Sequence, residues 1–511
     1  MTQTPVSVFM ADSLAQLKPR YIGIDETKLS ISGISFDSRK VHSGDAFFCM
    51  PGQNFDGNQF IRDAVASGAA VVITEKPFED ASVPQVIVSD VRLALGVVAS
   101  QFYGNPSQRL RLIAVTGTNG KTTTTHLVQH ILNHAGQRCG LIGTLGARSA
   151  ANESYTDVKH TTPFSSDLQR LLGEMADATC THVSMEVSSH ALVQKRVAGC
   201  DFAVACLTNV TQDHLDFHKT MENYWRAKRL LFEDIAAGHQ KNRAAVLNAD
   251  EPLVGEFSQT IKAANGTAGD GGVKLLTYGW NAPADLHVKS MKYWQGITEL
   301  SLNTPAGPLD MRLRLTGRFN MYNTMAAAAI CLHEGVPLAV IKEAMENFSG
   351  VAGRFEVVSS GREAEPLVVV DYAHTPDGLD NVLKTAAGLV PEGGKLICVF
   401  GCGGDRDASK RPQMAQIAET HADEVIVTSD NPRSEDPQQI IANILSGISR
   451  MKIVTVEPDR ATAIALAVGN ARTVDVVVVA GKGHEDYQIL ADRTIDFDDR
   501  KEVAKALKSR P

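Results

Sequence analysis

Short apolar runs separated by turn residues make up the first hundred residues of the chain. Ala46–Met50 and Ala70–Ile73 have the length and composition of buried strands, and Ile31–Phe36 alternates apolar with small residues. Phe60–Ser67 has a helical pattern and is followed by a glycine, which favours a helix end. We expect a small α/β unit here, joined to the rest of the chain by a polar linker at Tyr103–Arg109.

The pattern becomes more regular after this linker. Leu110–Val115 is an apolar strand, Thr116–Thr122 is a glycine-containing loop, and Thr123–Ala135 is an amphipathic helix. Further strands are expected at Gly140–Ile142, His182–Val187 and Ala203–Thr208. Apolar strands that alternate with helical patterns are typical of a parallel α/β sheet.

A second alternating region begins near residue 351. Its expected strands are Leu367–Val370, Lys395–Phe400, Glu424–Thr428 and Val474–Val479, and its expected helices include Gln413–His421 and Pro437–Ile448. This pattern predicts a Rossmann-like, doubly wound unit. We therefore predict an α/β protein of three domains, with a smaller N-terminal α/β domain at 1–108, a central parallel-sheet domain at 109–350 and a C-terminal domain at 351–511.

The composition is that of an ordinary globular protein. The chain has 511 residues, of which 43% are hydrophobic and 21% are charged, and this balance excludes disordered and fibrous classes. Its net charge of −8 argues against a nucleic-acid binder, since such proteins are usually basic. The eight cysteines include no C-x-x-C pair, so we expect neither a disulfide scaffold nor a structural zinc site.

No targeting or membrane segment is evident. The N-terminus has no basic region followed by a long apolar stretch, which a secretory signal would need. The longest apolar runs, such as Val476–Ala480, are strand-sized and far shorter than the ~20 residues that cross a bilayer. We expect a cytoplasmic protein without membrane insertion.

The strongest chemical signal lies between the first strand and helix of the central region. Val115–Thr123 reads V-T-G-T-N-G-K-T-T, whereas a standard phosphate loop has glycine where this chain has valine. Small residues still let successive backbone N–H groups bind phosphate oxygens at the positive end of the helix. We expect Lys121 to reach the β- and γ-phosphates of a nucleotide and the Thr122 hydroxyl to bind Mg²⁺. The candidate nucleotide-binding residues of the loop are Gly117, Thr118, Asn119, Gly120, Lys121, Thr122 and Thr123.

This loop resembles the nucleotide loop of the Mur ligase family, which also includes the folylpolyglutamate synthases. The resemblance extends over essentially the whole chain. It implies that the central domain is a P-loop-type ATPase domain that uses ATP together with two Mg²⁺ ions.

Two strand ends carry candidate metal ligands. Glu186 follows an apolar strand, and the carboxyl end of a parallel strand faces the ligand crevice. Its carboxylate is a hard oxygen ligand suited to Mg²⁺. His214 resembles the family's ligand for a second Mg²⁺, although imidazole is an unusual Mg²⁺ ligand and spacing alone would not justify the assignment. We interpret Asp213, Asp216 and His218 as polar loop residues.

Lys228 lies in a helical segment and by default would be a lysine with a solvated head. The resemblance implies that it is carbamylated by CO₂, which turns a cation into an anion able to support the second metal. The lysine must first lose its proton, and burial or a cationic setting favours that loss.

Four further residues are candidates for the rest of the nucleotide site. Asn320 and Asn323, on one helix face, match the family's G-x-x-N-x-x-N motif, and an amide can both donate to and accept from adenine. Arg354 could neutralise phosphate charge across the domain cleft. Asp371, at another strand end, is a candidate contact on the ribose or adenine side.

The N-terminal segment D-S-R at Asp37–Arg39 resembles the UDP-holding domain of those Mur ligases that use UDP-linked muramoyl peptides. Folylpolyglutamate synthases do not share this domain. The resemblance implies these contacts for a UDP-muramoyl peptide: Ser38, Gln53, Asn54, Phe55, Thr161, Thr162, Ser188, Gln194 and Arg196.

The C-terminal domain carries a D-N-P-R segment that resembles the signature of ligases adding meso-2,6-diaminopimelate. Diaminopimelate ends in an amino-acid zwitterion where lysine has a bare ammonium, so arginines would bind its carboxylate and repel lysine. The candidate residues are Arg406, Asp430, Asn431, Pro432, Arg433, Gly481 and Glu485.

Taken together, the resemblance implies an ATP-dependent amide ligase that adds meso-2,6-diaminopimelate to UDP-N-acetylmuramoyl-L-alanyl-D-glutamate through an acyl phosphate, acting as a monomer. Three alternatives stay open at this point. They are a lysine-adding ligase of the same family, a folylpolyglutamate synthase, and a nucleotide-gated binding module without ligase activity.

Overall fold

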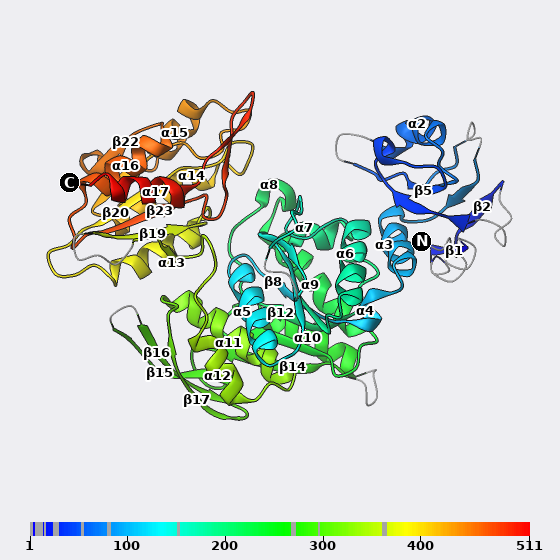
Figure 1. Ribbon diagram of the computed structural model, residues 1–511, viewed down its shortest axis with the longest axis horizontal. Helices are drawn as coiled ribbons and strands as arrows, with labels where there is room; N and C mark the ends of the chain where they lie inside the picture. Colours follow the sequence, from blue (N-terminus) through cyan, green and yellow to red (C-terminus); the bar gives the residue numbers. More distant parts are fainter. Residues whose placement is uncertain are drawn as a thin grey trace.

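The computed structural model describes residues 4–5, 14, 17–23, 30–52, 56–78, 83–150, 154–266, 272–294, 297–359 and 365–510. Three successive parts of the chain each build a sheet with helices packed against it (Figure 1). This confirms the three-part α/β architecture, while the residue limits of the domains stay a prediction. The predicted limit at 350 falls between two elements, and that at 108 falls inside a short helix, α4 (Pro106–Arg109).

The N-terminal part holds a five-stranded sheet in the order β2-β7-β6-β5-β4, parallel except at β2. Every residue of β5 and β6 is buried, as their continuous apolar runs predict. The elements are β1 (Thr4–Pro5), β2 (Arg20–Ile22), β3 (Ser30–Ile31), β4 (Gly33–Ser35), η2 (Ser38–Lys40), β5 (Asp45–Phe48), η3 (Gly57–Phe60), α2 (Ile61–Ala66), β6 (Val71–Thr74), β7 (Gln85–Ile87) and α3 (Val91–Phe102).

The central part is built on a ten-stranded sheet in the order β10-β9-β11-β8-β12-β13-β14-β15-β16-β17. Its strands are β8 (Arg111–Thr116), β9 (Cys139–Gly143), β10 (Gly146–Arg148), β11 (His182–Glu186), β12 (Phe202–Leu207), β13 (Ala244–Asn248), β14 (Lys274–Gly279), β15 (Leu286–Trp294), β16 (Ile297–Thr304) and β17 (Gly307–Leu313). Its helices are α4, α5 (Lys121–His134), α6 (Ser165–Asp177), α7 (Ser189–Val193), α8 (Leu215–His218), α9 (Met221–Ala237), α10 (Val254–Asn265), α11 (Arg318–His333) and α12 (Leu338–Glu346).

The sequence predicted a parallel sheet, and the strands from β9 to β15 are parallel as predicted. The strands at the two ends of the sheet differ from this prediction. β10, β16 and β17 pair antiparallel with their neighbours. β17 alternates buried and exposed side chains, which is typical of a strand with one face toward water. Tight turns join these strands, so no crossover helix marks them in the sequence.

The C-terminal part is a six-stranded sheet in the order β18-β19-β23-β20-β21-β22, parallel except at β18. The predicted strands and both predicted helices are present with shifted ends. The elements are β18 (Glu356–Val357), β19 (Leu367–Asp371), α13 (Pro376–Ala387), β20 (Leu396–Phe400), α14 (Lys410–His421), β21 (Glu424–Val427), α15 (Pro437–Leu445), η5 (Met451–Ile453), β22 (Val454–Val456), α16 (Arg460–Asn470), β23 (Val476–Ala480), β24 (Tyr487–Ile489), β25 (Thr494–Asp496) and α17 (Asp499–Lys508).

The central part lies between the other two (Figure 1). On the N-terminal side, Gly96 of α3 packs so closely against Ala198 that an added Cβ would lie 2.4 Å from the Ala198 Cβ. Nearby, the Lys195 ammonium lies 2.5 Å from an Asp90 carboxylate oxygen. The two units are therefore fixed to each other by close packing as well as by charge. Among the described helices, none combines the length and apolar character needed to cross a membrane.

Candidate active site

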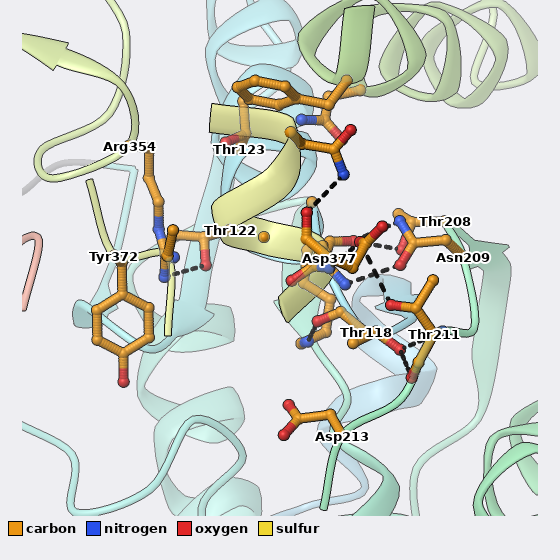
Figure 2. A pocket seen from close by; sticks show the side chains of 18 of the residues that line it. Thr118, Thr122, Thr123, Thr208, Asn209, Thr211, Asp213, Arg354, Tyr372 and Asp377 are labelled. Atoms are coloured by element: carbon orange, nitrogen blue, oxygen red, sulfur yellow. Dashed lines mark hydrogen bonds between the residues drawn. The ribbon is translucent and has the colours of Figure 1, made fainter. Parts of the chain in front are cut away.

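A cavity of about 510 Å³ opens between the central and C-terminal parts. The carboxyl ends of central strands form one wall, together with the loop before α5, and residues from β19 and α13 form the other (Figure 2). Ligands of open α/β sheets bind at this edge because the loops after the strands converge there. The cavity is therefore the candidate active site.

The loop 116–120 bends tightly enough to require its two glycines. Gly117 has φ +149° and Gly120 has φ +85°, and a Cβ on Gly117 would lie 1.8 Å from the Thr208 hydroxyl. α5 begins at Lys121, two residues earlier than expected. The threonines that follow are poor helix formers in isolation, but burial in this helix overrides that preference.

Lys121 curls back over the loop that it follows. Its Nζ donates to the carbonyl oxygens of Gly117 at 2.9 Å and Thr118 at 2.8 Å. Desolvation lowers the pKa of Lys121, while the carboxylates of Glu186 and Asp213 oppose this change. The ammonium is therefore held at the mouth of the loop, where a phosphate would meet it.

Glu186, at the end of β11, is fully buried beside the loop. One carboxylate oxygen accepts from the Thr122 and Thr144 hydroxyls, each at 3.1 Å, and the other accepts from the Thr144 N–H at 2.9 Å. These hydrogen-bond partners are all neutral groups. Buried carboxylate and hydroxyl oxygens beside a phosphate loop fit Mg²⁺, which favours oxygen ligands.

His214 lines the same cavity with its side chain 39% exposed, whereas Lys228 of α9 is buried and does not line it. Burial lowers the pKa of His214 to about 3, even though its Nε2 is 3.3 Å from an Asp213 carboxylate oxygen. Lys228 is 1% exposed, and its Nζ lies 4.2 Å from the centroid of the Tyr224 ring. Burial, with a smaller effect of Lys121, lowers the pKa of Lys228 well below its ordinary value. A neutral imidazole and a lysine that loses its proton easily are what the predicted second metal site requires.

No cluster of three or more His, Cys, Asp or Glu side chains suited to a metal occurs in the described ranges. The predicted metal ligands, Thr122, Glu186, His214 and Lys228, are thus too sparse to form a complete cage. Mg²⁺ commonly keeps waters and binds through one or two carboxylates together with substrate phosphates. The residues present fit that mode of binding.

Asn320 and Asn323 of α11 do not share one role. Asn323 lines the cavity, whereas Asn320 lies behind it. The Asn320 amide donates to the Thr316 carbonyl at 2.8 Å, and its oxygen accepts from the Asn323 amide at 3.2 Å. Asn320 therefore orients Asn323, which is the amide that faces the cavity.

Arg354 and Asp371 reach the cavity from the C-terminal part. An Arg354 guanidinium N–H donates to the Thr122 hydroxyl at 3.1 Å, while its Nε is buried without a hydrogen-bond partner in the described structure. Burial raises the pKa of Asp371 to about 6, and its carboxylate accepts from the Phe355 N–H at 2.6 Å. Arg354 thus presents an unsatisfied donor beside the phosphate loop, as an anion-binding residue would.

Several cavity residues were not among the predicted ones. Asp377 accepts from the Asn119 amide at 2.6 Å and from the Thr211 hydroxyl at 3.3 Å (Figure 2). Asp213, which we interpreted as a polar loop residue, does lie in a loop, and there it is buried and lines the cavity. His214 and His374 are the main causes that lower the pKa of Asp213 to about 2 against the opposing effect of burial. The position of Asp213 just after a predicted strand was the available signal.

Other lining residues that the sequence did not single out are Thr144, Asn209, Thr211, Arg318, Tyr322, Tyr372 and His374.

The predicted peptide-binding residues of the central part surround Glu186. Thr161 and Ser188 line the cavity. The Thr162 hydroxyl donates to the Glu186 carbonyl at 2.9 Å, and Arg196 donates to the Thr162 carbonyl at 2.9 Å and to the Gln194 amide oxygen. These residues form one connected set that extends away from the phosphate loop.

The N-terminal candidates are placed only in part. Ser38 begins η2 in the N-terminal unit, and Gln53, Asn54 and Phe55 lie outside the described residues. A stack of side chains leads from this unit to the set around Arg196. The rings of Phe36 and Phe164 are 5.1 Å apart, and the Arg196 guanidinium lies 4.3 Å above the Phe164 ring.

The candidates for amino-acid binding gather around Lys482, which is fully buried. Its Nζ lies 3.0 Å from the Asn431 amide oxygen, 3.2 Å from a Glu485 oxygen and 3.5 Å from an Asp430 oxygen. Burial, together with the charge of Asp430, raises the pKa of Glu485. The Tyr372 hydroxyl is 3.4 Å from the other Glu485 oxygen, and this contact links the cluster to the cavity.

The two predicted arginines flank Gly403 at the rim of this cluster. A Cβ on Gly403 would lie 2.9 Å from Arg433 Nη1 and 3.9 Å from Arg406 Cγ. Arg433 has φ +54° and donates to the Gly404 carbonyl at 2.8 Å, whereas Arg406 is exposed. Pro432 and Gly481 belong to the same two loops as Asn431 and Lys482.

Known proteins match the chain along nearly its whole length. Residues 30–103 match the model of the Mur ligase family catalytic domain, 115–331 that of the Mur ligase middle domain, and 353–483 that of the Mur ligase glutamate ligase domain. The UDP-N-acetylmuramoyl-L-alanyl-D-glutamate–2,6-diaminopimelate ligase of Geobacillus thermodenitrificans is 46% identical over 94% of this chain and 95% of that protein. The ligase of the same name from Synechococcus elongatus is 46% identical over 97% of both chains.

A solved structure of a UDP-N-acetylmuramoyl-L-alanyl-D-glutamate–2,6-diaminopimelate ligase is also similar. It covers 96% of this chain and 97% of its own, with 35% identity and a TM-score of 0.68. Likeness at this level in sequence, domain order and structure leaves one conclusion. The chain belongs to the Mur ligase family.

Proposed function

We propose that the chain catalyses ATP-dependent formation of an amide bond, adding meso-2,6-diaminopimelate to UDP-N-acetylmuramoyl-L-alanyl-D-glutamate. Relatives that are 44–46% identical carry the name of this ligase. The observation that supports the reaction best is the convergence on one cavity of the phosphate loop, the buried Glu186 carboxylate and Arg354. The Asp430–Glu485 cluster joins that cavity through Tyr372.

The reaction has two steps. The D-glutamyl side-chain carboxylate attacks the γ-phosphate of ATP, which releases ADP and leaves an acyl phosphate. The diaminopimelate amine then attacks the acyl carbon, loses a proton, and phosphate departs. Neither step needs a covalent bond to the protein, so positioning and charge stabilisation are the chain's contributions.

Each wall of the cavity supplies part of that stabilisation. Lys121 and the backbone N–H groups of the loop bind the phosphates, and Arg354 binds the transferred group from the opposite wall. Asn323 recognises adenine and is held by Asn320, while Asp371 lies at the C-terminal side of the nucleotide. These roles rest on the lining of the cavity and on the unpartnered Nε of Arg354.

Two Mg²⁺ ions complete the site in this proposal. Thr122 and Glu186 would hold the first, and His214 and Lys228 would hold the second, the lysine as a carbamate formed from its neutral amine and CO₂ with loss of a proton. When bound, the ions would supply positive charge beside the transferred phosphoryl group. The burial of Lys228 and the lowering of its pKa support this assignment.

The muramoyl substrate binds along the set from Ser188 to Arg196, with its UDP end at Ser38 and the segment 53–55. Such substrates are anionic, and hydroxyl, amide and guanidinium donors suit them. We propose that the chain works as a cytoplasmic monomer, in the synthesis of peptidoglycan precursors.

Arg433 and Arg406 provide the preference for diaminopimelate over lysine. A guanidinium binds the distal carboxylate of diaminopimelate and repels the lysine ammonium. The Asp430 and Glu485 carboxylates bind the ammonium of the same zwitterion. This supports the diaminopimelate ligase over a lysine-adding ligase.

The deciding experiment measures ATP hydrolysis and amide product with the UDP-muramoyl dipeptide and either diaminopimelate or lysine. We expect turnover only when the nucleotide, the dipeptide and diaminopimelate are all present. Product from lysine at the same rate would favour the lysine-adding ligase, and turnover with folate substrates would favour a folylpolyglutamate synthase. Nucleotide binding without turnover would identify a binding module.

The same assay tests the arginine directly. Arg433→Ala should lose diaminopimelate incorporation selectively, by about 10-fold or more, because one charged hydrogen-bonded pair contributes about 1.5–3 kcal/mol. Arg450→Ala, at an exposed position of the same domain, is the matched control. An unchanged ratio of diaminopimelate to lysine product would contradict the role of Arg433.

A further inference from the structure

One ion pair of the C-terminal part is completely excluded from solvent. Arg460, the first residue of α16, forms two hydrogen bonds to Asp499, the first residue of α17, at 2.8 and 2.7 Å. Both side chains are 0% exposed. Burying two charges is costly, and a well-packed apolar pair would serve stability at least as well. The pair therefore invites a functional explanation.

The remaining N–H groups of Arg460 reach two loops of the amino-acid cluster, which is the group of Asp430, Asn431, Lys482 and Glu485. Nη2 donates to the Ala480 carbonyl at 3.0 Å, and Nη1 to the Ser429 carbonyl at 3.5 Å. Ala480 directly precedes Gly481, and Ser429 directly precedes Asp430. One guanidinium thus holds the backbone at the start of both loops.

No sheet ladder could do this, because the two loops follow strands that are not neighbours. β21 and β23 lie on opposite sides of β20 in the sheet. The Arg460 guanidinium instead bridges the two loops through its hydrogen bonds to the Ser429 and Ala480 carbonyls. A Cβ on Gly481 would lie 3.0 Å from an Asp430 carboxylate oxygen and 3.8 Å from Arg460 Nη2, so the loops and the guanidinium are in close contact.

Asp499 fixes the charge and the direction of this guanidinium. Burial by itself would lower the pKa of Arg460, but Asp499, with smaller contributions from Asp430 and Glu485, raises it above its ordinary value. Asp499 binds one side of the planar guanidinium, so the N–H groups on its other side point toward the carbonyls of Ser429 and Ala480. A lysine has no such fork and could not reach both.

We propose that the Arg460–Asp499 pair positions the amino-acid substrate by fixing the two loops that carry Asp430 and Glu485. Neither Arg460 nor Asp499 touches the substrate, so both are positioning residues. This inference rests on the proposed function, because it concerns the site at which the incoming amino acid binds.

The test compares Asp499→Asn and Arg460→Lys with Asp475→Asn. Asp475 is a matched control, since its side chain is 3% exposed, pairs with Arg472 at 2.8 Å and accepts the Lys395 N–H at 2.9 Å. It lies at the opposite end of β23, away from the loops. Steady-state kinetics with each of the three substrates varied gives three KM values per protein, and thermal melting gives the loss of stability.

We expect both site variants to raise the KM for diaminopimelate about 10-fold or more and to leave the KM values for ATP and the UDP-muramoyl dipeptide within about twofold. Asp475→Asn should lower the melting temperature without changing any KM. If the site variants shift all three KM values together, or only lower the melting temperature as the control does, the pair is merely structural and the proposal is wrong.

Arg460→Lys serves as the milder variant should Asp499→Asn not fold. It keeps the charge beside Asp499 but loses the bridge to one carbonyl, and an unchanged KM for diaminopimelate in this variant would overturn the proposal. Failure of the proposed function looks different. In that case the unaltered chain itself would make no amide product with diaminopimelate.

Discussion

The surroundings of Lys228 in the fold differ from those that its local sequence predicts. Its segment has the pattern of an exposed amphipathic helix, and such a helix usually keeps its lysines in water. In the fold, α9 instead buries Lys228 beside Tyr224, where it is 1% exposed. Burial costs the ammonium its hydration, which favours the neutral amine that CO₂ needs as a nucleophile.

At this scale we predict that Lys228→Ala lowers ligase activity by about 100-fold or more, since it removes the anion proposed to support the second metal. Added formate or acetate should restore part of the activity by occupying the vacated position. Ligase rates with and without the carboxylates measure both effects.

Arg226→Ala is the control, because Arg226 lies on the same helix and is 56% exposed. It should retain full activity and show no response to carboxylates. Full activity of Lys228→Ala would contradict the proposed role, and a loss that no carboxylate restores would weaken it.

At the scale of elements, the edge of the central sheet opposite the cavity is tied together by a buried carboxylate. Glu334, which follows α11, accepts from Arg111 of β8 at 2.7 Å and lies 3.2 Å from Nε2 of His182 of β11. β8 leads to the phosphate loop, β11 ends in Glu186, and α11 carries Asn323. The three elements that form much of the site are therefore fixed to one another at the sheet edge opposite the cavity.

These interactions of the Glu334 carboxylate predict that the stability of the fold depends on pH. Burial alone would raise the pKa of Glu334, but the hydrogen bonds from His182 and Arg111 lower it from 4.5 to about 2. A lowered pKa stabilises the fold above pH 4.5, and this contribution is lost as the pH falls toward 2. Glu334→Gln should therefore cost about 3 kcal/mol at pH 7, and the cost should shrink between pH 4.5 and 3.

Thermal unfolding of the central part across this pH range measures the effect. Glu343→Gln is the control, because the Glu343 side chain is 67% exposed and lies 3.5 Å from His134. It should change the melting temperature little at any pH. A cost of Glu334→Gln that stays constant down to pH 3 would contradict the assignment.

At the scale of the whole molecule, three hydrogen bonds cross the cavity between the central and C-terminal parts. Asp377 accepts from Asn119 and Thr211, and Arg354 donates to Thr122. The hydrogen bonds to Asn119 and Thr122 involve residues at which a nucleotide is proposed to bind. Binding of a nucleotide and separation of the two parts are therefore expected to be coupled.

We predict that Asp377→Ala increases the radius of gyration of the ligand-free chain in small-angle scattering, because the link to the phosphate loop is lost. A non-hydrolysable ATP analogue with Mg²⁺ should reverse the increase. Asp380→Ala, on the same helix, removes contacts to Lys384 and His421 within the C-terminal part and should leave the scattering unchanged. Identical curves for Asp377→Ala and the unaltered chain would contradict the coupling.

Local patterning was sufficient to predict much of this architecture. Strands such as β8 and β23 are continuous apolar runs, and buried parallel strands need such runs because both their faces are covered. The hairpins of the central sheet escaped prediction because alternating strands joined by short turns carry a weaker signal. The loop before α5 could be recognised because glycine adopts positive φ at the lowest cost, and this loop needs positive φ at Gly117 and Gly120.

The sequence by itself therefore determined the three α/β units, the phosphate loop and the residue types suited to phosphate, metal and zwitterion. Only the tertiary structure decided which of these side chains meet. It placed Asn320 behind Asn323, buried Lys228 and Asp213, brought Asp377 to the phosphate loop and set Arg460 behind the amino-acid cluster. The physical reason is that local propensity depends on neighbouring residues, whereas burial and charge depend on packing between elements far apart in the chain.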